Sequence, residues 1–251
     1  MWTSTVLKKG TIVGFFLVAL MPLYGLQAAD HNKIPHIGVV ELFTSQGCSS
    51  CPPADVVLKT YTGRKDVIAL SYSVDYWDYL GWKDTYGRSE HSKRQRDYAR
   101  TRKDGAVYTP QAVINGVSHV NGAHKALIDQ ELKRTYKSLA DQCVGLSVVQ
   151  KRNELQVDID GPLKHSDQQL VLWMLRVKDV GVVKVRRGEN GGRKLAYHNV
   201  VLGATKVANV EPANKSFKVK RPKGDLSEGE HNVFLLQVGA SGPILGASKL
   251  R

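Results

Sequence analysis

Residues 41–55 read ELFTSQGCSSCPPAD, and this stretch decides the fold that the sequence predicts. An apolar run at residues 37–43 leads into a Ser-Gln-Gly turn, and Pro52 opens a helical pattern. The order predicts a buried strand, then the Cys-x-x-Cys pair of Cys48 and Cys51, then a helix. A cysteine at a helix N-terminus faces unpaired backbone N–H groups and the positive end of the helix dipole, which favour thiolate over thiol. The stretch therefore predicts a reactive dithiol.

A Cys-x-x-Cys pair alone has three interpretations: half of a structural zinc site, a static disulfide of an exported protein, or a redox-active dithiol. Zinc is disfavoured because the chain has 3 cysteines and no second Cys-x-x-Cys or His-x-x-x-His pair. The redox dithiol is preferred, with the static disulfide as its alternative. The third cysteine, Cys143, is expected to be buried, and pairing between chains or a free thiol are the other possibilities.

Residues 1–29 have the pattern of a secretory signal peptide. Two lysines precede an apolar, uncharged stretch at residues 10–26, and cleavage fits near Ala28 or Ala29. A membrane anchor is the alternative, but the apolar run is short for a span of about 20 residues. We expect a mature chain that begins near residue 30, retains no stable membrane span and works in a periplasm or outside the cell, where disulfides persist.

The formal net charge is +13 and 42% of residues are hydrophobic, as in an ordinary globular protein. A basic protein attracts acidic partners or anionic surfaces. The basic residues here are scattered along the chain and accompany no nucleic-acid motif, so no nucleic-acid binding is expected.

Residues 30–142 alternate strands and helices. Apolar periodicity predicts strands at residues 37–43, 67–72, 111–114 and 117–120, and helices at residues 52–61, 89–103 and 124–139. Asn115-Gly116 is a strong hairpin signal, and Ser89 is the expected N-cap of the second helix. This order of elements is that of an α/β thioredoxin-like domain. In that fold a proline with a cis peptide bond stands beside the dithiol at the start of the third strand, and Thr109-Pro110 occupies that place.

After Cys143 the helical patterns stop. Seven or eight short strand-like segments follow in about 105 residues, with turn residues between them. We expect residues 143–251 to form an all-β, sandwich-like C-terminal domain. Such a domain serves docking or dimerisation more often than a second reaction.

Several motifs carry a family resemblance. Residues 41–55 look like the opening signature of a family of secreted thioredoxin-like proteins, the domain of unknown function number 1223. Residues 74–84 and 108–111 resemble its next two motifs, and residues 188–201 resemble the motif of its β domain. The resemblance covers nearly all of the mature chain and implies a thioredoxin-like fold with a β-rich tail. It brings no established reaction or substrate.

The wider thioredoxin superfamily implies roles for individual residues. Cys48 would attack as the more exposed cysteine, Cys51 would resolve, and Thr109, before Pro110, would offer backbone groups to a substrate strand. The chain departs from familiar reductases in its Ser-Ser dipeptide and in Gly47, which stands where they have tryptophan. The expected reduction potential therefore lies anywhere between about −270 mV, as in thioredoxin, and about −120 mV, as in a strong oxidant. No cofactor is needed, because the dithiol carries the electrons.

Two further residues are candidates for the site. Thioredoxin-like proteins often bury a carboxylate on the strand that leads into the dithiol, so the resemblance implies that Glu41, seven residues before Cys48, accepts the proton of the resolving thiol. A salt-bridged structural glutamate is the equal alternative. Trp77, in the aromatic loop at residues 75–82, is a candidate for substrate binding, although a local core under a long insertion is the favoured interpretation. A metal site is not favoured among the residues Asp75, Asp78, Asp84, Glu90 and His91.

The sequence therefore predicts an exported thiol–disulfide oxidoreductase. It would act through a mixed disulfide on protein thiols or disulfides of the envelope, with an unidentified redox partner. One alternative is a non-enzymatic thioredoxin-fold protein that binds Cu(I) or an envelope protein. The other is a module in which the disulfide is purely structural.

Overall fold

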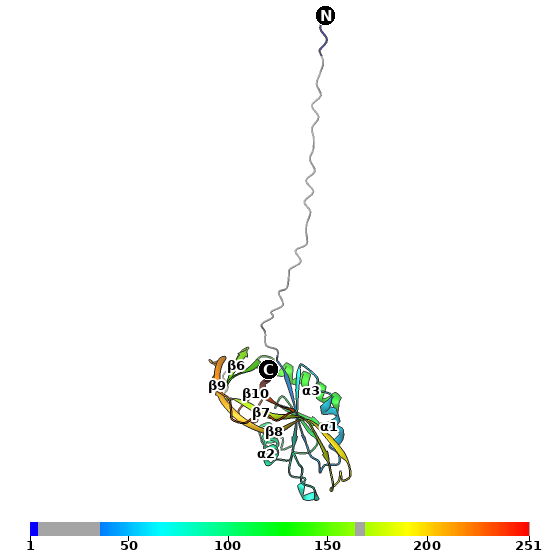
Figure 1. Ribbon diagram of the computed structural model, residues 1–251. Helices are drawn as coiled ribbons and strands as arrows, with labels where there is room; N and C mark the ends of the chain where they lie inside the picture. Colours follow the sequence, from blue (N-terminus) through cyan, green and yellow to red (C-terminus); the bar gives the residue numbers. More distant parts are fainter. Residues whose placement is uncertain (5–35, 164–168, 251) are drawn as a thin grey trace. The chain divides into compact units, whose positions relative to one another are not determined.

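The computed structural model describes residues 1–4, 36–163 and 169–250, and its elements lie in the unit Lys33–Arg251 (Figure 1). The predicted signal peptide lies outside the described residues, apart from its first four. In chain order the elements are β1 (Gly38–Thr44), α1 (Pro52–Lys59), β2 (Val67–Ser73), the 3-10 helix η1 (Asp78–Leu80), α2 (Ser89–Arg102), β3 (Gln111–Ile114), β4 (Ser118–Asn121), α3 (Lys125–Ser138), β5 (Gly145–Lys151), β6 (Glu154–Asp160), β7 (Leu170–Lys184), β8 (Lys194–Val210), β9 (Ser216–Lys220), β10 (Glu230–Val238) and β11 (Ile244–Lys249).

Eight strands form one sheet in the order β11-β10-β7-β8-β2-β1-β3-β4. β1 pairs in parallel with β2 along its whole length and antiparallel with β3 on its other side. All of β2 is buried, and so is all of β1 except Gly38. Continuous burial is what apolar strands show when both faces of their sheet are covered.

Helices cover both faces of the sheet around β1. Val40 and Leu42 belong to the core beneath α1 and α3. Val39 and Phe43 point to the opposite face, where Tyr98 of α2 packs. Figure 1 shows α1 and α3 together and α2 apart from them. Because side chains alternate along a strand, Glu41 lies on the α2 face.

The strands after Cys143 number seven among the described residues. Four of them, β7, β8, β10 and β11, extend the sheet that contains β1, and β8 joins β2 through the pair Ser71 and Val200. The other three, β5, β6 and β9, form a second sheet that packs on β7 and β10. The fold is therefore mixed α/β with one large sheet, and sandwich-like packing is limited to the smaller sheet. The division into domains at residues 142 and 143 stays a prediction.

Local signals placed most boundaries within one or two residues. The Asn115-Gly116 hairpin is confirmed, with φ values of 49° and 72° at its two central residues. The N-cap prediction for Ser89 is wrong by one residue, because Arg88 has the extended backbone of the cap and the Ser89 hydroxyl bonds Glu90 instead. Within the described ranges, no helix is long and apolar enough to cross a membrane.

Candidate functional site

The end of β1 and the start of α1 place the two cysteines. A turn follows Thr44, and α1 begins at Pro52 with Cys51 as its N-cap residue. Cys48 and Cys51 form a disulfide with a Cα–Cα distance of 5.4 Å. The free amides of the first helical turn would stabilise a thiolate here. Cys48 has an exposed fraction of 2% and Cys51 of 0%, so the greater exposure expected for Cys48 is almost absent in this oxidised form.

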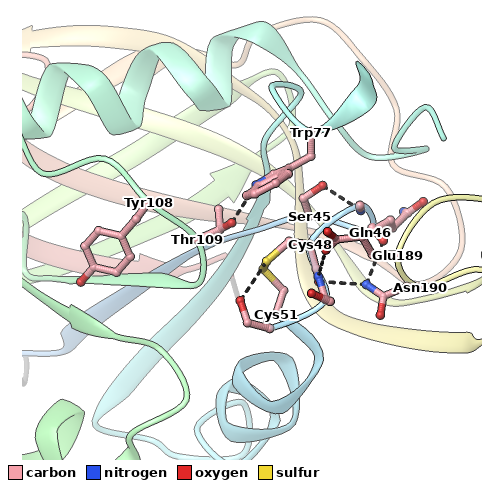
Figure 2. The surroundings of a disulfide bond; sticks show 12 residues. Ser45, Gln46, Cys48, Cys51, Trp77, Tyr108, Thr109, Glu189 and Asn190 are labelled. Carbon is pink, nitrogen blue, oxygen red and sulfur yellow. Dashed lines mark hydrogen bonds between the residues drawn. A yellow bond between two sulfur atoms is a disulfide. The ribbon is translucent and has the colours of Figure 1, made fainter. Parts of the chain in front are cut away.

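Trp77 and Thr109 flank the disulfide on one side (Figure 2). The indole Nε1–H of Trp77 donates to Thr109 Oγ1 at 2.8 Å. A Cβ atom at Gly47 would lie 3.0 Å from the Trp77 Cβ, so a larger residue at position 47 would push against Trp77. Trp77 therefore connects the residue before Cys48 with the residue before the proline.

The Thr109–Pro110 peptide bond is cis, as predicted. A Cβ atom at Gly122 would lie 3.2 Å from the Ala54 Cβ and 3.7 Å from the Pro110 Cβ, so the start of β3 lies close to α1. The structure thus brings five of the predicted site residues to one end of β1, and their roles stay predictions. These five are Cys48, Cys51, Trp77, Thr109 and Pro110.

A loop between β7 and β8, residues 188–193, covers the other side of the disulfide, and we call it the cap loop. Figure 2 shows Glu189 and Asn190 of this loop beside the turn that holds Cys48. The fully buried Asn190 donates through Nδ2 to the carbonyl oxygens of Gln46 at 3.0 Å and Cys48 at 2.8 Å. Glu189 accepts the Ser49 backbone N–H at 3.0 Å, and hydrogen bonds from Ser49 lower the pKa of its carboxyl. The sequence analysis did not assign these contacts.

The aromatic loop holds the same turn from its other side. Gln46 donates its backbone N–H to Asp84 Oδ2 at 2.7 Å, and its side-chain oxygen accepts the Trp82 Nε1–H at 2.8 Å. These contacts agree with the interpretation of the loop as a local core. Tyr79 is exposed, however, and its ring stacks on Trp77 at a centroid distance of 6.3 Å, so part of the loop remains available to a partner.

Glu41 does not approach the dithiol through any hydrogen bond among the described residues. It is fully buried, and its Oε1 accepts the Nε–H of Arg94 at 2.8 Å. Its Oε2 accepts hydrogen bonds from Arg94 Nη2 at 3.2 Å and from the Tyr98 hydroxyl. These contacts, on the α2 face, favour the salt-bridged alternative over the predicted exchange of a proton with Cys51.

Asp55 of α1 is a second buried carboxyl, which the sequence analysis did not single out. It lies four residues after Cys51, with an exposed fraction of 6%, and its Oδ1 has no hydrogen-bond partner. Burial raises the pKa of the Asp55 carboxyl well above its usual range; the Thr44 hydroxyl opposes this shift and the charge of Asp84 adds to it. The helical spacing from Cys51 was the available signal.

Cys143 is a half-buried free cysteine, and burial raises the pKa of its thiol to about 11, so it is almost entirely protonated at neutral pH. Among the described residues, no group of three or more His, Cys, Asp or Glu side chains has the arrangement of a metal site. Asp84, two residues after the aromatic loop, instead accepts backbone N–H groups from Gln46 and Tyr86.

Comparisons with known proteins agree with the motifs. The family described as "Protein of unknown function (DUF1223)" matches residues 39–237. A crystal structure of a protein from Agrobacterium tumefaciens is similar over 86% of this chain and 95% of its own, with 33% identity and a TM-score of 0.70. HBP35 of Porphyromonas gingivalis is similar over 86% of this chain and 75% of its own; its 13% identity and TM-score of 0.56 show a shared fold alone. No curated protein matches the chain. The match over residues 39–237 shows that this chain belongs to the DUF1223 family.

Proposed function

We propose that this protein is a thiol–disulfide oxidoreductase and that residues 30–142 form its thioredoxin-like domain. One observation carries the proposal: Cys48 and Cys51 form a disulfide at the N-terminus of α1, and Thr109, which precedes the cis-proline and β3, lies beside it. The helix end favours a thiolate. The backbone of Thr109 is suited to pair with an extended segment of a client.

The proposed reaction uses the dithiol alone. A client thiolate attacks Sγ of Cys48, the bond to Cys51 breaks, and Cys51 leaves as a thiolate. A second client thiolate then attacks the client sulfur of the mixed disulfide, and Cys48 leaves as a thiolate. The client has been oxidised to a disulfide and the protein reduced by two electrons; the reverse sequence reduces a client disulfide.

The burial of both sulfur atoms restricts the clients of this reaction. The cap loop and Trp77 flank the disulfide, so a client must displace one of them to reach Cys48. A protein that binds the surrounding surface can supply the free energy for that displacement, whereas a small thiol has few contacts to offer. We therefore propose selected protein thiols or disulfides as the substrates.

We also propose an oxidising location for this reaction. Residues 1–29 would act as a signal peptide cleaved near Ala28 or Ala29, which delivers the protein to the periplasm or the exterior. The clients and the redox partner would then be envelope or extracellular proteins. Mass spectrometry of the protein recovered from the envelope fraction tests this proposal, because a retained N-terminal segment would contradict cleavage.

The burial of the cysteines also supports a second candidate, a purely structural disulfide. The reduction potential of the pair separates the two, measured by equilibration in glutathione buffers followed by thiol trapping. A value above about −200 mV indicates an oxidant or isomerase, and a value near −270 mV a reductase. A pair that stays oxidised below about −300 mV contradicts the enzyme and supports the structural disulfide.

A trapping experiment tests the mixed disulfide directly. The double variant Cys51→Ala/Cys143→Ala retains Cys48 alone, and it should form a covalent adduct with an unfolded protein that carries disulfides. The matched control, Cys48→Ala/Cys143→Ala, should form far less adduct because the proposed mechanism assigns the attack on the client to Cys48 and only the resolving step to Cys51. Equal adduct yields from the two variants would contradict Cys48 as the attacking residue.

Binding of Cu(I) by the same dithiol is the alternative without a catalytic reaction, since thiolates select this soft cation. Titration of the reduced protein separates it from the proposed enzyme. Tight 1:1 uptake of Cu(I) that is lost in Cys48→Ser would support copper binding. Weak uptake of Cu(I) without a fixed stoichiometry would contradict this alternative.

A further inference from the structure

Three buried polar atoms without a well-formed hydrogen bond come from α1, from β1, which leads into the turn that holds Cys48, and from β8. They are Asp55 Oδ1 on α1, Thr44 Oγ1 at the end of β1 and the Tyr197 hydroxyl on β8. The Thr44 hydroxyl nevertheless lies close enough to the Asp55 carboxyl to lower its pKa. Most buried polar atoms in proteins have partners, and an exception at a reactive site is often functional. This group of Asp55, Thr44 and Tyr197 is called the orphan cluster below.

The members of the orphan cluster influence one another's pKa values. Burial raises the pKa of the Tyr197 hydroxyl, and the charges of Asp55 and Asp84 raise it further. Thr44 and Asp84 likewise act on the Asp55 carboxyl. The titratable groups coupled to Asp55 are Asp84, two residues after the aromatic loop, and Tyr197 of β8. The Cys51 thiol of the reduced protein lies one helical turn before Asp55 on the same helix.

The helix directs Asp55 toward Cys51. The Asp55 backbone N–H donates to the carbonyl oxygen of Cys51 at 3.2 Å, which is the bond of one helical turn. Residues four apart lie on the same face, with Cβ atoms about 5–6 Å apart. Helical side chains also lean toward the N-terminus, so the Asp55 carboxyl covers the turn that starts at Cys51.

The carboxyl groups of Asp84 and Glu41 already accept hydrogen bonds from other residues. Asp84 accepts the backbone N–H groups of Gln46 and Tyr86, at 2.7 Å and 2.8 Å. Glu41 is bound by Arg94 and Tyr98 on the opposite face of the sheet. Of these three carboxyls, Asp55 is the one with a buried oxygen that makes no well-formed hydrogen bond, and its residue lies one helical turn after Cys51.

A buried thiol needs a proton acceptor before it can resolve a mixed disulfide, because the thiolate is the nucleophile and a free thiol has a pKa of about 8.5. We propose that Asp55 exchanges a proton with the Cys51 thiol each time the Cys48–Cys51 bond forms or breaks. This inference rests on the oxidoreductase function proposed above and adds a residue to it.

The proton and the electrons balance in each direction. When the bond forms, the Asp55 carboxylate takes the proton of Cys51, the thiolate attacks Sγ of Cys48, and the client leaves as a thiolate. The protein dithiol is oxidised and the client disulfide is reduced. When the bond breaks, Cys51 leaves as a thiolate and receives the proton of the neutral Asp55 carboxyl.

The aromatic disulfide 5,5′-dithiobis(2-nitrobenzoate) resolves the two steps. Reduced Cys143→Ala protein should release one coloured thiolate when Cys48 attacks and a second when Cys51 resolves. Stopped-flow rates are recorded between about pH 5 and about pH 9. Asp55→Asn should slow the second release by about 10²-fold at pH 7 and remove its inflection with pH, while the first release changes by less than about threefold.

Asp97→Asn is the matched control, because it makes the same chemical change to a carboxyl on α2 that pairs with Lys93. It should leave both releases unchanged. Thr44→Val gives a second test that does not alter the carboxyl. Because the Thr44 hydroxyl lowers the pKa of Asp55, its removal should move the inflection of the second release to higher pH.

The outcomes distinguish this inference from the function on which it rests. Two releases with an unchanged pH profile in Asp55→Asn overturn the role of Asp55 and leave the oxidoreductase standing. Fewer than two releases from the parent protein, together with no mixed disulfide between Cys51→Ala/Cys143→Ala and an unfolded protein that carries disulfides, overturn both. If circular dichroism shows that Asp55→Asn is unfolded, Thr44→Val decides, and an inflection that stays in place rejects the proposal.

Discussion

The two faces of the sheet near β1 each bury a carboxyl, and they treat it differently. On the α2 face, both oxygens of Glu41 have partners, Arg94 and Tyr98. On the α1 face, Asp55 has an oxygen with no partner. A buried charge is tolerated when it is paired and becomes costly when it is not. Glu41 therefore has the contacts of a structural ion pair, whereas the uptake of a proton by Asp55 would relieve the cost of burying its charge. Burial alone does not distinguish a functional carboxyl; its partners do.

The largest effect is expected from removal of the buried ion pair between Glu41 and Arg94. Arg94→Met removes the cation and keeps much of the side-chain volume, so Glu41 remains buried without its ion partner. The free energy of unfolding should fall by about 3–5 kcal/mol. Urea unfolding measures this loss. A loss below about 1 kcal/mol would mean that the two carboxyls differ less than their contacts indicate.

Acid should also act through the α2 face. Burial lowers the pKa of His91 to about 4, although its hydrogen bond to the Ser73 carbonyl opposes the shift. Because the pKa in the folded protein lies below the ordinary value of 6.5, neutral His91 contributes its full stabilisation of the fold above pH 6.5. This contribution is lost as the pH falls toward 4. About 3 kcal/mol should disappear over this window. Between pH 4 and pH 6.5, the urea midpoint of His91→Gln should change less with pH than that of the parent protein. An equal change in both proteins would exclude His91 as the cause.

The cap loop gives a third test of the difference between the two faces. It precedes β8, the strand that carries Tyr197 of the orphan cluster. Asn190→Ala leaves the carbonyl oxygens of Gln46 and Cys48 without this donor and should cost about 2 kcal/mol. Dithiothreitol should then reduce the disulfide faster. Glu189→Gln, which keeps the shape of the loop, is the control for stability. An unchanged reduction rate in Asn190→Ala would show that the cap loop does not limit access.

The smallest effect is expected for the stability of Asp55→Asn. The pKa of Asp55 is raised in the folded protein, so the folded state binds the extra proton and the parent protein loses stability as the pH rises through that raised value. The amide does not titrate. At pH 5 the variant should be less stable by about 1 kcal/mol, and its deficit should shrink or reverse toward pH 9. Parallel stability curves would contradict an orphan carboxyl.

Much of the fold could be predicted from local patterns. The strand at 37–43, the helix after Cys51 and the Asn115-Gly116 hairpin each follow from apolar spacing or turn chemistry within a few residues. The continuation of the sheet from β2 into β8 could not be predicted, because only the pair Ser71 and Val200 joins these strands across a long stretch of sequence.

The site divides in the same way. Cys48, Cys51 and the Thr109-Pro110 pair were found because motif spacing identifies them. The cap contact between Asn190 and Cys48 spans 142 positions in the chain, and no local signal reports it. Glu41 was selected as the buried carboxyl because of its distance from Cys48 along the chain, but strand alternation turns it to the other face.

The sequence by itself determined that a dithiol stands at the start of a helix, after a buried strand and before a Thr-Pro pair. Backbone preferences and apolar periodicity act over a few residues, so the chain carries that information locally. Only the tertiary structure decided which carboxyl is paired, which is left without a partner, and what covers the disulfide. Those properties depend on desolvation and hydrogen bonding between segments far apart in the chain, such as Asp55 and Tyr197, and are fixed only when the sheet assembles.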